Sequence, residues 1–333
     1  MAATGFYKAP VYRARSCRRP HRSKIVSYRL MMFTSSLVSS MEYMETRVLL
    51  SPRADNSSDK NLQRARGACR ITLGNSEKST RIMDLYQKSP MRVLFPRTSG
   101  ATVEEAVLVN TSGGVAGGDQ LQTNVTAMEG ASIVITTQAA EKVYRALKES
   151  AQILTTLKAS DSARLAWLPQ ETIVFNRARL SRATHIEITS GAELLALEWL
   201  VLGRAAYGEK LAAATITDCW RVVKDGRLVW AENFRITDDV LPHLGRQALL
   251  SDCTAVATLV YSGTASGARL ELLRDLASSL ECHSGATLVG GLMVARFAAR
   301  TSYDLRTSVR SVLQQCAKGF ARGPFQVPRM WSC

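Results

Sequence analysis

From Leu62 onward, short strand-like segments follow one another at close spacing. Segments such as ACRITL, EAVLVN, SIVITTQ and QILTTLK are rich in apolar and β-branched residues, and turn residues such as Gly74 and Gly130 separate them. The Asp225-Gly226 pair between RVVK and RLVW is a strong hairpin signal. This rhythm continues over roughly two hundred residues and predicts a mainly β body.

Helical patterns occur late in the chain. Apolar residues recur at helical spacing between Ala268 and Leu280 and again between Ser302 and Lys318, where Gly319 ends the pattern. The run from Ala196 to Leu202 is apolar almost throughout, so it predicts a short buried helix or a buried strand without deciding between them. We therefore expect a large β scaffold with two or three helices, mostly in the C-terminal third.

A glycine-rich run, SGGVAGGD, precedes one of the predicted strands. Its two glycine pairs are Gly113-Gly114 and Gly117-Gly118, and Asp119 follows them. A phosphate-binding loop needs a lysine and a helix after the glycines, whereas this run enters alternating strand sequence. We expect instead a tight turn in which glycines, Gly117 among them, adopt positive φ and Asp119 caps the turn through backbone N–H groups.

The positive charge is concentrated at the N-terminus. Residues 1–66 carry 13 basic and 4 acidic residues, so 9 of the 15 net positive charges fall there. We expect residues 1–60 to be a disordered basic extension. A start codon assigned too early, at Met1 instead of Met41 or Met44, would explain such an extension. A transit peptide and a weak signal peptide are the alternatives. The body from residue 61 to residue 333 is only mildly basic, so we expect no nucleic-acid partner.

Cysteine usage and hydropathy indicate the compartment. Seven scattered cysteines, an odd number without C-x-x-C, argue against a disulfide framework or a structural zinc site. No apolar run approaches the ~20 residues needed to span a bilayer, and the run from Leu194 to Gly203 is too short. We expect a cytoplasmic protein without a membrane partner.

Signals for catalysis are weak. No G-x-S-x-G, H-x-H or H-E-x-x-H occurs. Glu281-Cys282-His283 is the densest ligand patch; a helix end with ordinary residues is the favoured interpretation, and a transient metal contact the alternative. His185 lies in alternating strand sequence, opposite its isoleucine neighbours, so it should face solvent.

Four acidic residues stand out: Asp119, Glu171, Glu198 and Glu209. A carboxylate among apolar residues should be paired, and Arg204 is a plausible local partner for Glu198. For each of the four acids, a structural salt bridge is the simplest interpretation. The alternative is an oxygen-lined polar path through the β scaffold that accepts divalent metals.

Five motifs together resemble one family. In chain order they are SGGVAGGD, TTQAAEKVYR, WLPQE, LEWLVLGRAAYGE and the terminal PRMW, and they extend from about residue 64 to the end. Each motif alone is weak, but the ordered set is similar to the urease accessory protein UreD family, also called UreH. The residues before 60 have no counterpart in the family pattern.

The resemblance implies a non-enzymatic, mostly β scaffold that is described as β-helix-like. Members of the family bind a helical UreF-like accessory protein, which recruits a UreG-like GTPase, and the complex docks on the urease apoenzyme. The resemblance therefore implies urease maturation by nickel delivery, with transient nickel and no tightly bound cofactor. The alternative from another class is an all-β small-molecule or metal-dependent enzyme.

The resemblance also assigns candidate residues. Asp119, Glu171 and Glu209 match the family's acidic motif positions and are expected to contact nickel transiently. The remaining candidates, expected to support the nickel path or a partner contact, are Gly113, Gly114, Gly117, Gly118, Thr137, Lys142, Tyr144 and Arg204.

Overall fold

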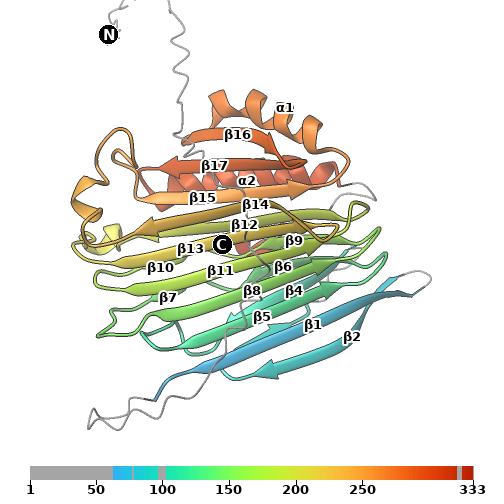
Figure 1. Ribbon diagram of the computed structural model, residues 1–333, viewed down its shortest axis with the longest axis horizontal. Coiled ribbons are helices and arrows are strands. Elements are labelled where there is room, and N and C mark those ends of the chain that lie inside the picture. The colour runs from blue at the N-terminus through green and yellow to red at the C-terminus, as the bar shows by residue number, and fades with distance from the viewer. Residues whose placement is uncertain (1–62, 77–78, 97–102, 321–324, 333) are drawn as a thin grey trace, which may run out of the picture. The chain divides into compact units, whose positions relative to one another are not determined.

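The computed structural model describes residues 63–76, 79–96, 103–320 and 325–332 (Figure 1). The disordered basic extension expected over residues 1–60 lies outside these residues. Two sheets form the body. Sheet A has the order β14-β13-β11-β8-β5-β1-β2. Its strands are β1 (Arg66–Ser76), β2 (Ser79–Lys88), β5 (Gln120–Ala127), β8 (Ala151–Ala159), β11 (Arg179–Ile188), β13 (Thr215–Lys224) and β14 (Arg227–Ile236).

Sheet B has the main order β16-β17-β15-β12-β9-β6-β4-β3, and β10 joins it between β12 and β7. Its strands are β3 (Met91–Leu94), β4 (Glu104–Asn110), β6 (Ser132–Thr137), β7 (Glu141–Val143), β9 (Arg164–Leu168), β10 (Thr172–Val174), β12 (Glu193–Leu202), β15 (Ala255–Ser262), β16 (His283–Val289) and β17 (Leu292–Ala299).

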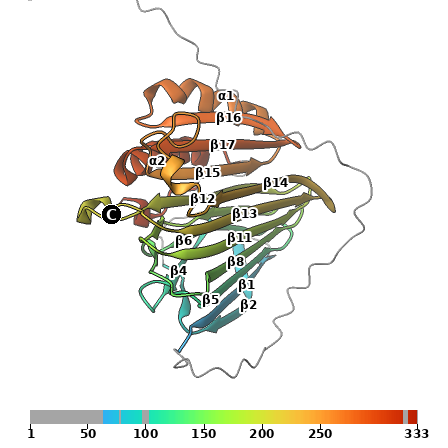
Figure 2. The same cartoon turned by 60° about the vertical axis from the view of Figure 1, so that its left-hand side comes forward.

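The chain alternates between the two sheets as it rises through the stack. It passes from β4 to β5, from β6 and β7 to β8, from β9 and β10 to β11, and from β12 to β13. Each of these strands pairs in parallel with its counterpart in an adjacent coil. Figure 2 shows the stacked strands from the side. This is a β-solenoid of two-sided coils, which confirms the expected β-helix-like scaffold.

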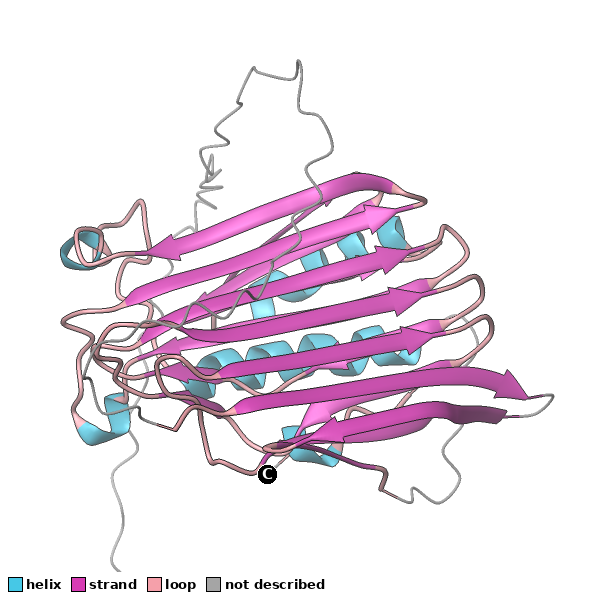
Figure 3. Cartoon of the chain, turned by 60° about the horizontal axis from the view of Figure 1, so that its bottom comes forward, coloured by secondary structure: helices cyan, strands magenta, loops and turns pink. Residues whose placement is uncertain are grey.

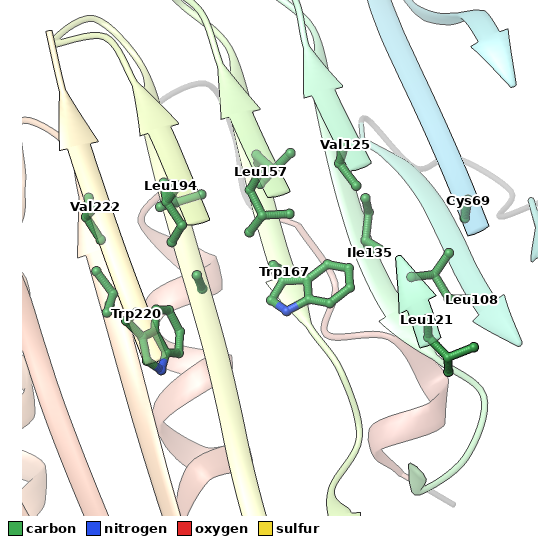
Figure 4. Close-up of a cluster of buried hydrophobic side chains, with 14 of the residues drawn as sticks. Cys69, Leu108, Leu121, Val125, Ile135, Leu157, Trp167, Leu194, Trp220 and Val222 are labelled. Atoms are coloured by element: carbon green, nitrogen blue, oxygen red, sulfur yellow. The ribbon is translucent and has the colours of Figure 1, made fainter. Parts of the chain in front are cut away.

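The main core fills the space between the sheets. In strands such as β11, alternate residues point inward, because successive side chains of a strand face opposite sides. Figure 4 shows Leu121, Val125 and Leu157 of sheet A beside Ile135 and Trp167 of sheet B. The alternation seen in the sequence is therefore the inner and outer face of each coil.

Two helices cover the outer face of sheet B (Figure 3). They are α1 (Ser266–Leu276) and α2 (Ser302–Lys318), and the Thr301 hydroxyl caps α2 by accepting the Asp304 N–H. Short 3₁₀ turns are η1 (Ala205–Tyr207), η2 (Leu241–His243), η3 (Ala277–Ser279) and η4 (Arg329–Trp331). No helix in the described part of the chain is long and apolar enough to cross a membrane.

The ambiguous run from Ala196 to Leu202 is part of strand β12. Every residue of β12 is buried. One set of alternate side chains, including Leu194 and Leu200, joins the core between the sheets, and the other, including Leu195 and Trp199, packs beneath the helices. Burial on both faces removes the polar alternation by which a strand is recognised.

The sequence patterns were correct for most elements. The predicted helix from Ser302 to Lys318 has those bounds, and the Asp225-Gly226 hairpin turn has φ values of 50° and 76°. His185 is exposed, as expected. The sequence analysis missed β2, whose side chains are exposed on both faces, and the β16–β17 hairpin, whose Gly290-Gly291 turn has φ of 57° and 78°.

The patch Glu281-Cys282-His283 is not a helix end. Helix α1 ends at Leu276, the following 3₁₀ turn ends at Ser279, and His283 begins strand β16. The apolar pattern that predicted a helix as far as Leu280 is longer than the helix itself. Leu280 is apolar because it packs, partly buried, against the core beneath the helices.

One buried ionic cluster connects the two sheets. Arg182 of β11 is 2% exposed and donates two hydrogen bonds to Asp218 of β13, at 2.9 and 2.7 Å. Its third contact crosses to sheet B, where Nη1 donates to Glu198 of β12 at 2.7 Å and to Thr172 of β10 at 3.1 Å. The Trp167 indole donates to the other Glu198 oxygen at 2.8 Å.

Glu198 is therefore paired with Arg182, and the expectation that Arg204 would pair with it is wrong. The sequence suggested Arg204 because it is near in the chain, whereas the coil brings Arg182 opposite Glu198 from the facing sheet. Burial raises the pKa of the Glu198 carboxyl, and the Arg182 charge offsets part of that rise. Burial lowers the pKa of Arg182, but the two carboxylates raise it by more.

Replacing Arg182 by alanine should destabilise the protein by about 3–5 kcal/mol, because two buried carboxylates then lose their counter-ion. Urea unfolding followed by circular dichroism measures this loss. The matched control is Arg70→Ala, which removes an exposed pair with Asp84 and should cost less than about 1 kcal/mol. Equal losses in the two variants would contradict a structural role for the buried cluster.

Candidate functional site

Most of the candidate site residues lie where the chain passes from sheet B to sheet A. Four connections stack there, at residues 111–119, 144–150, 175–178 and 203–214. We call their combined surface the loop face. Backbone hydrogen bonds join adjacent connections, for example Ala146 N–H to the Arg177 carbonyl at 3.0 Å and Arg177 N–H to the Ala213 carbonyl at 2.7 Å. The stacking of the coils therefore continues into these loops.

The glycine-rich turn lies directly against the next connection. Val115 donates its N–H to the Lys142 carbonyl at 2.7 Å and accepts the Tyr144 N–H at 2.9 Å. A Cβ on Gly114 would lie 2.5 Å from the Tyr144 ring. Gly113, Gly114 and Gly118 have φ of 74°, 150° and 89°, as a turn rich in glycine predicts. The Lys142 side chain itself is exposed.

Gly117 has a different role from the one expected. Its φ is not among the positive values, so the expected backbone conformation is wrong. A Cβ at this position would instead lie 2.5 Å from the Glu149 carbonyl oxygen and 2.7 Å from the Ala146 Cβ. Glycine is required here because two backbones approach each other, which the sequence of one segment cannot reveal.

Asp119 caps the glycine-rich turn, as expected. One carboxylate oxygen accepts the Ala116 N–H at 2.7 Å, and the other accepts the Ala65 N–H at 2.8 Å. Asp119 is 7% exposed. Because Ala65 precedes strand β1, this one side chain joins the turn to the first strand of sheet A. Both oxygens are engaged by the protein itself.

A chain of contacts runs from the turn to the motif LGRAAYGE. The Tyr144 hydroxyl donates to the Gly113 carbonyl at 2.9 Å, and its ring meets the Phe175 ring edge-on at 5.2 Å. The Arg204 guanidinium lies 4.1 Å from the centre of the Phe175 ring. Arg204 also donates two hydrogen bonds to Glu209, at 3.0 and 2.9 Å, and these lower the pKa of the Glu209 carboxyl. Three motifs thus meet on the loop face.

These contacts border a depression of about 350 Å³. Three arginines and one glutamate give it a net positive charge. Its lining residues are Arg145, Phe175, Asn176, Arg177, Arg204 and Glu209.

Glu171 is directed toward the helical layer instead. Its carboxylate accepts a hydrogen bond from Arg306 of α2 at 2.8 Å. The Arg306 guanidinium lies 5.7 Å from the Trp199 ring and also bonds Gln170. Thr137, another candidate, accepts the Gln170 N–H at 2.8 Å through its hydroxyl. The structure therefore brings Thr137 and Glu171 to the WLPQE motif at the junction with α2, and not to the depression.

Each of the three candidate nickel acids has its own protein partner: backbone N–H groups for Asp119, Arg306 for Glu171 and Arg204 for Glu209. Within the described residues, no group of three or more His, Cys, Asp or Glu side chains is arranged to hold a metal ion. A role of these acids in transient nickel contact stays a prediction.

One acid was missed by the sequence analysis. Glu141, in the motif segment EKVYR, is partly buried and accepts hydrogen bonds from the Asn110 amide at 3.0 and 3.1 Å. Burial raises the pKa of the Glu141 carboxyl to about 7, and the nearby Asp119 charge adds to the rise. Glu141 stands inside the motif TTQAAEKVYR, but its contact with Asn110 of strand β4 depends on the tertiary structure.

The fold and the loop face define the class of protein: a β-solenoid with a helical cover on one sheet, which presents its motif residues on stacked loops. Residues 65–332 match the family model described as UreD urease accessory protein. The chain is also 38% identical over 270 residues to a urease accessory protein UreD of Rhizobium leguminosarum bv. viciae, and the alignment covers 81% of this chain and 96% of that protein.

Two further relatives agree with this match. A urease accessory protein UreD of Methylobacterium sp. (strain 4-46) is 40% identical over 81% of this chain and 96% of its own length. One of Brucella suis is 38% identical over 84% of this chain and 98% of its own length. The chain belongs to the UreD family of urease accessory proteins, which confirms the resemblance seen in the motifs.

Gly117→Ala should lower the free energy of unfolding by about 1–3 kcal/mol, because the added methyl group overlaps the Glu149 carbonyl. Thermal and urea unfolding measure the loss. Gly267→Ala in the first turn of α1 is the control, because nothing lies within 4 Å of a Cβ there. An unfolding free energy for Gly117→Ala equal to that of the control would contradict the close approach.

Glu141 should make stability depend on pH. Its folded pKa of about 7 lies above its ordinary value, so the unfolded chain releases this proton more readily and stability falls as pH rises between about 4.5 and 7. Glu141→Gln removes this component. The variant should match the parent at pH 4 and exceed it at pH 8 by an amount on the order of 1–3 kcal/mol. Urea unfolding across this range measures the difference, and a difference independent of pH would refute the assignment.

Proposed function

We propose that this chain is a urease maturation factor that acts in the cytoplasm as a non-catalytic scaffold. It binds UreF-like and UreG-like accessory proteins and the urease apoenzyme, and it helps deliver nickel to the urease active site. Nickel is the cargo of this process and passes transiently. The proposal rests above all on the family match over residues 65–332.

The arrangement of the motifs supports a scaffold role. SGGVAGGD, EKVYR and LGRAAYGE meet on the exposed loop face, while WLPQE lies against α2. Residues of a partner-binding scaffold are expected on loops held by a rigid body, because loops can vary while the body holds them in place. The tyrosines Tyr144 and Tyr207 are 37% and 81% exposed on this face, and exposed aromatic residues are typical of protein contacts.

Among the acids, Glu209 is the one we propose to contact nickel in passage. Its pairing with Arg204 is partly exposed, with 19% of the Glu209 side chain accessible. Replacing the Arg204 contact of Glu209 by a contact with nickel costs little free energy, because the ion pair is partly exposed. Asp119 would instead have to give up hydrogen bonds from two backbone N–H groups.

The maturation role is tested by co-expression of urease subunits, the remaining accessory proteins and this chain. Deleting the chain should strongly reduce the nickel bound per urease active site, measured by elemental analysis of purified urease, and urease activity should fall in proportion. Nickel content and activity that stay unchanged on deletion would refute the proposal.

Glu209→Gln should reduce urease activation in this assay by more than it reduces thermal stability, because the charge of a partly exposed pair contributes at most about 1 kcal/mol to folding. The control is Glu187→Gln, which removes an exposed carboxylate paired with Lys158 on the outer face of sheet A. Parallel losses of melting temperature and activation would instead assign Glu209 a structural role.

A further inference from the structure

Two arginines in the depression have no ionic partner. Arg145 and Arg177 are exposed, and no ion pair joins either of them to a neighbour within the residues that the structure describes. Arg204, the third arginine, is neutralised by its two hydrogen bonds to Glu209. The unbalanced charge of the depression therefore resides on Arg145 and Arg177.

The backbones that carry these two arginines are fixed. Arg145 forms an antiparallel bridge with Ala178. Arg177 has φ of 61° and is hydrogen-bonded on both sides, donating to the Ala213 carbonyl at 2.7 Å and accepting the Ala146 N–H at 3.0 Å. Positive φ is costly for a residue other than glycine and persists only where the surroundings impose it. Three stacked connections therefore fix the backbone positions of the two arginines that line the depression.

The surroundings of the depression are mixed in character. Phe175 contributes an aromatic wall. Tyr207 is 81% exposed, and its ring lies 5.6 Å from the Arg204 guanidinium. Leu147, in the same connection as Arg145, is 73% exposed. Guanidinium forks match carboxylates in geometry and charge, and neighbouring apolar side chains suit a ligand that also carries apolar residues.

We propose that this depression is a docking site for an acidic segment of a partner protein, in which Arg145 and Arg177 donate hydrogen bonds to a carboxylate. The exposed aliphatic side chain of Leu147 beside the arginines favours a peptide, which can bring apolar side chains of its own, over a phosphate backbone. That such a partner exists rests on the proposed scaffold role. The affinity of the depression for carboxylates does not depend on that role.

The test uses the full chain and a fluorescein-labelled hexaglutamate peptide, with binding followed by fluorescence anisotropy at low and moderate salt. The double variant Arg145→Glu/Arg177→Glu should weaken binding at least tenfold, because both donors become repulsive. The matched control Arg227→Glu/Arg235→Glu reverses two exposed charges of β14 and changes the net charge by the same amount. It should change affinity by less than about twofold, since distant exposed charges are screened by salt.

Equal weakening in both double variants would show that the peptide responds to overall charge and would overturn the proposal. Binding of a labelled hexathymidylate that depends on Arg145 and Arg177, with no such dependence for the peptide, would also overturn it. If the double variant melts below the parent, the single variant Arg145→Gln should still weaken peptide binding. The assay contains neither urease nor nickel, so failure of the maturation role and failure of this site are distinguished.

Discussion

The contact of Arg182 with Asp218 and Glu198 is the interaction on which the arrangement of the two sheets depends. Apolar packing between flat sheets does not by itself fix how one slides over the other, whereas a guanidinium held by carboxylates from both sheets does. Trp167 and Thr172 complete the hydrogen bonding of the cluster. The cluster joins the facing strands β11 and β12 across the core, and the parallel ladders within each sheet align the successive coils.

That register turns separate loops into one surface. Val115 bridges to Val143, and the Arg177 backbone is bonded to the connections before and after it. Glycine is needed where the backbones approach most closely, at Gly114 and Gly117. The stack leaves Tyr144, Arg145 and Tyr207 exposed, which suits the proposed contact with other proteins.

The motif residues divide between two places in the fold, the loop face and the junction with α2. Asp119 and Glu209 belong to the loop face, whereas Glu171 belongs to the junction with α2, where Arg306 holds it beside Trp199. The proposed scaffold role calls for more than one contact surface, and this division supplies two chemically different candidates. The depression with Arg145 and Arg177 is positive, while the acid at the helical junction is already neutralised.

The sequence by itself determined the mainly β class, helix α2, the Asp225-Gly226 hairpin and the capping of the turn by Asp119, because these depend on local period and local hydrogen bonding. It also determined the family, through motifs in a fixed order. Only the tertiary structure decided that β12 is a strand, since burial on both faces erases its alternation. It alone decided the partner of Glu198, the reason for Gly117 and the raised pKa of Glu141, because pairing, close approach and burial bring together segments that are distant in the chain. Arg182 is 16 residues from Glu198, and Glu149 is 32 residues from Gly117.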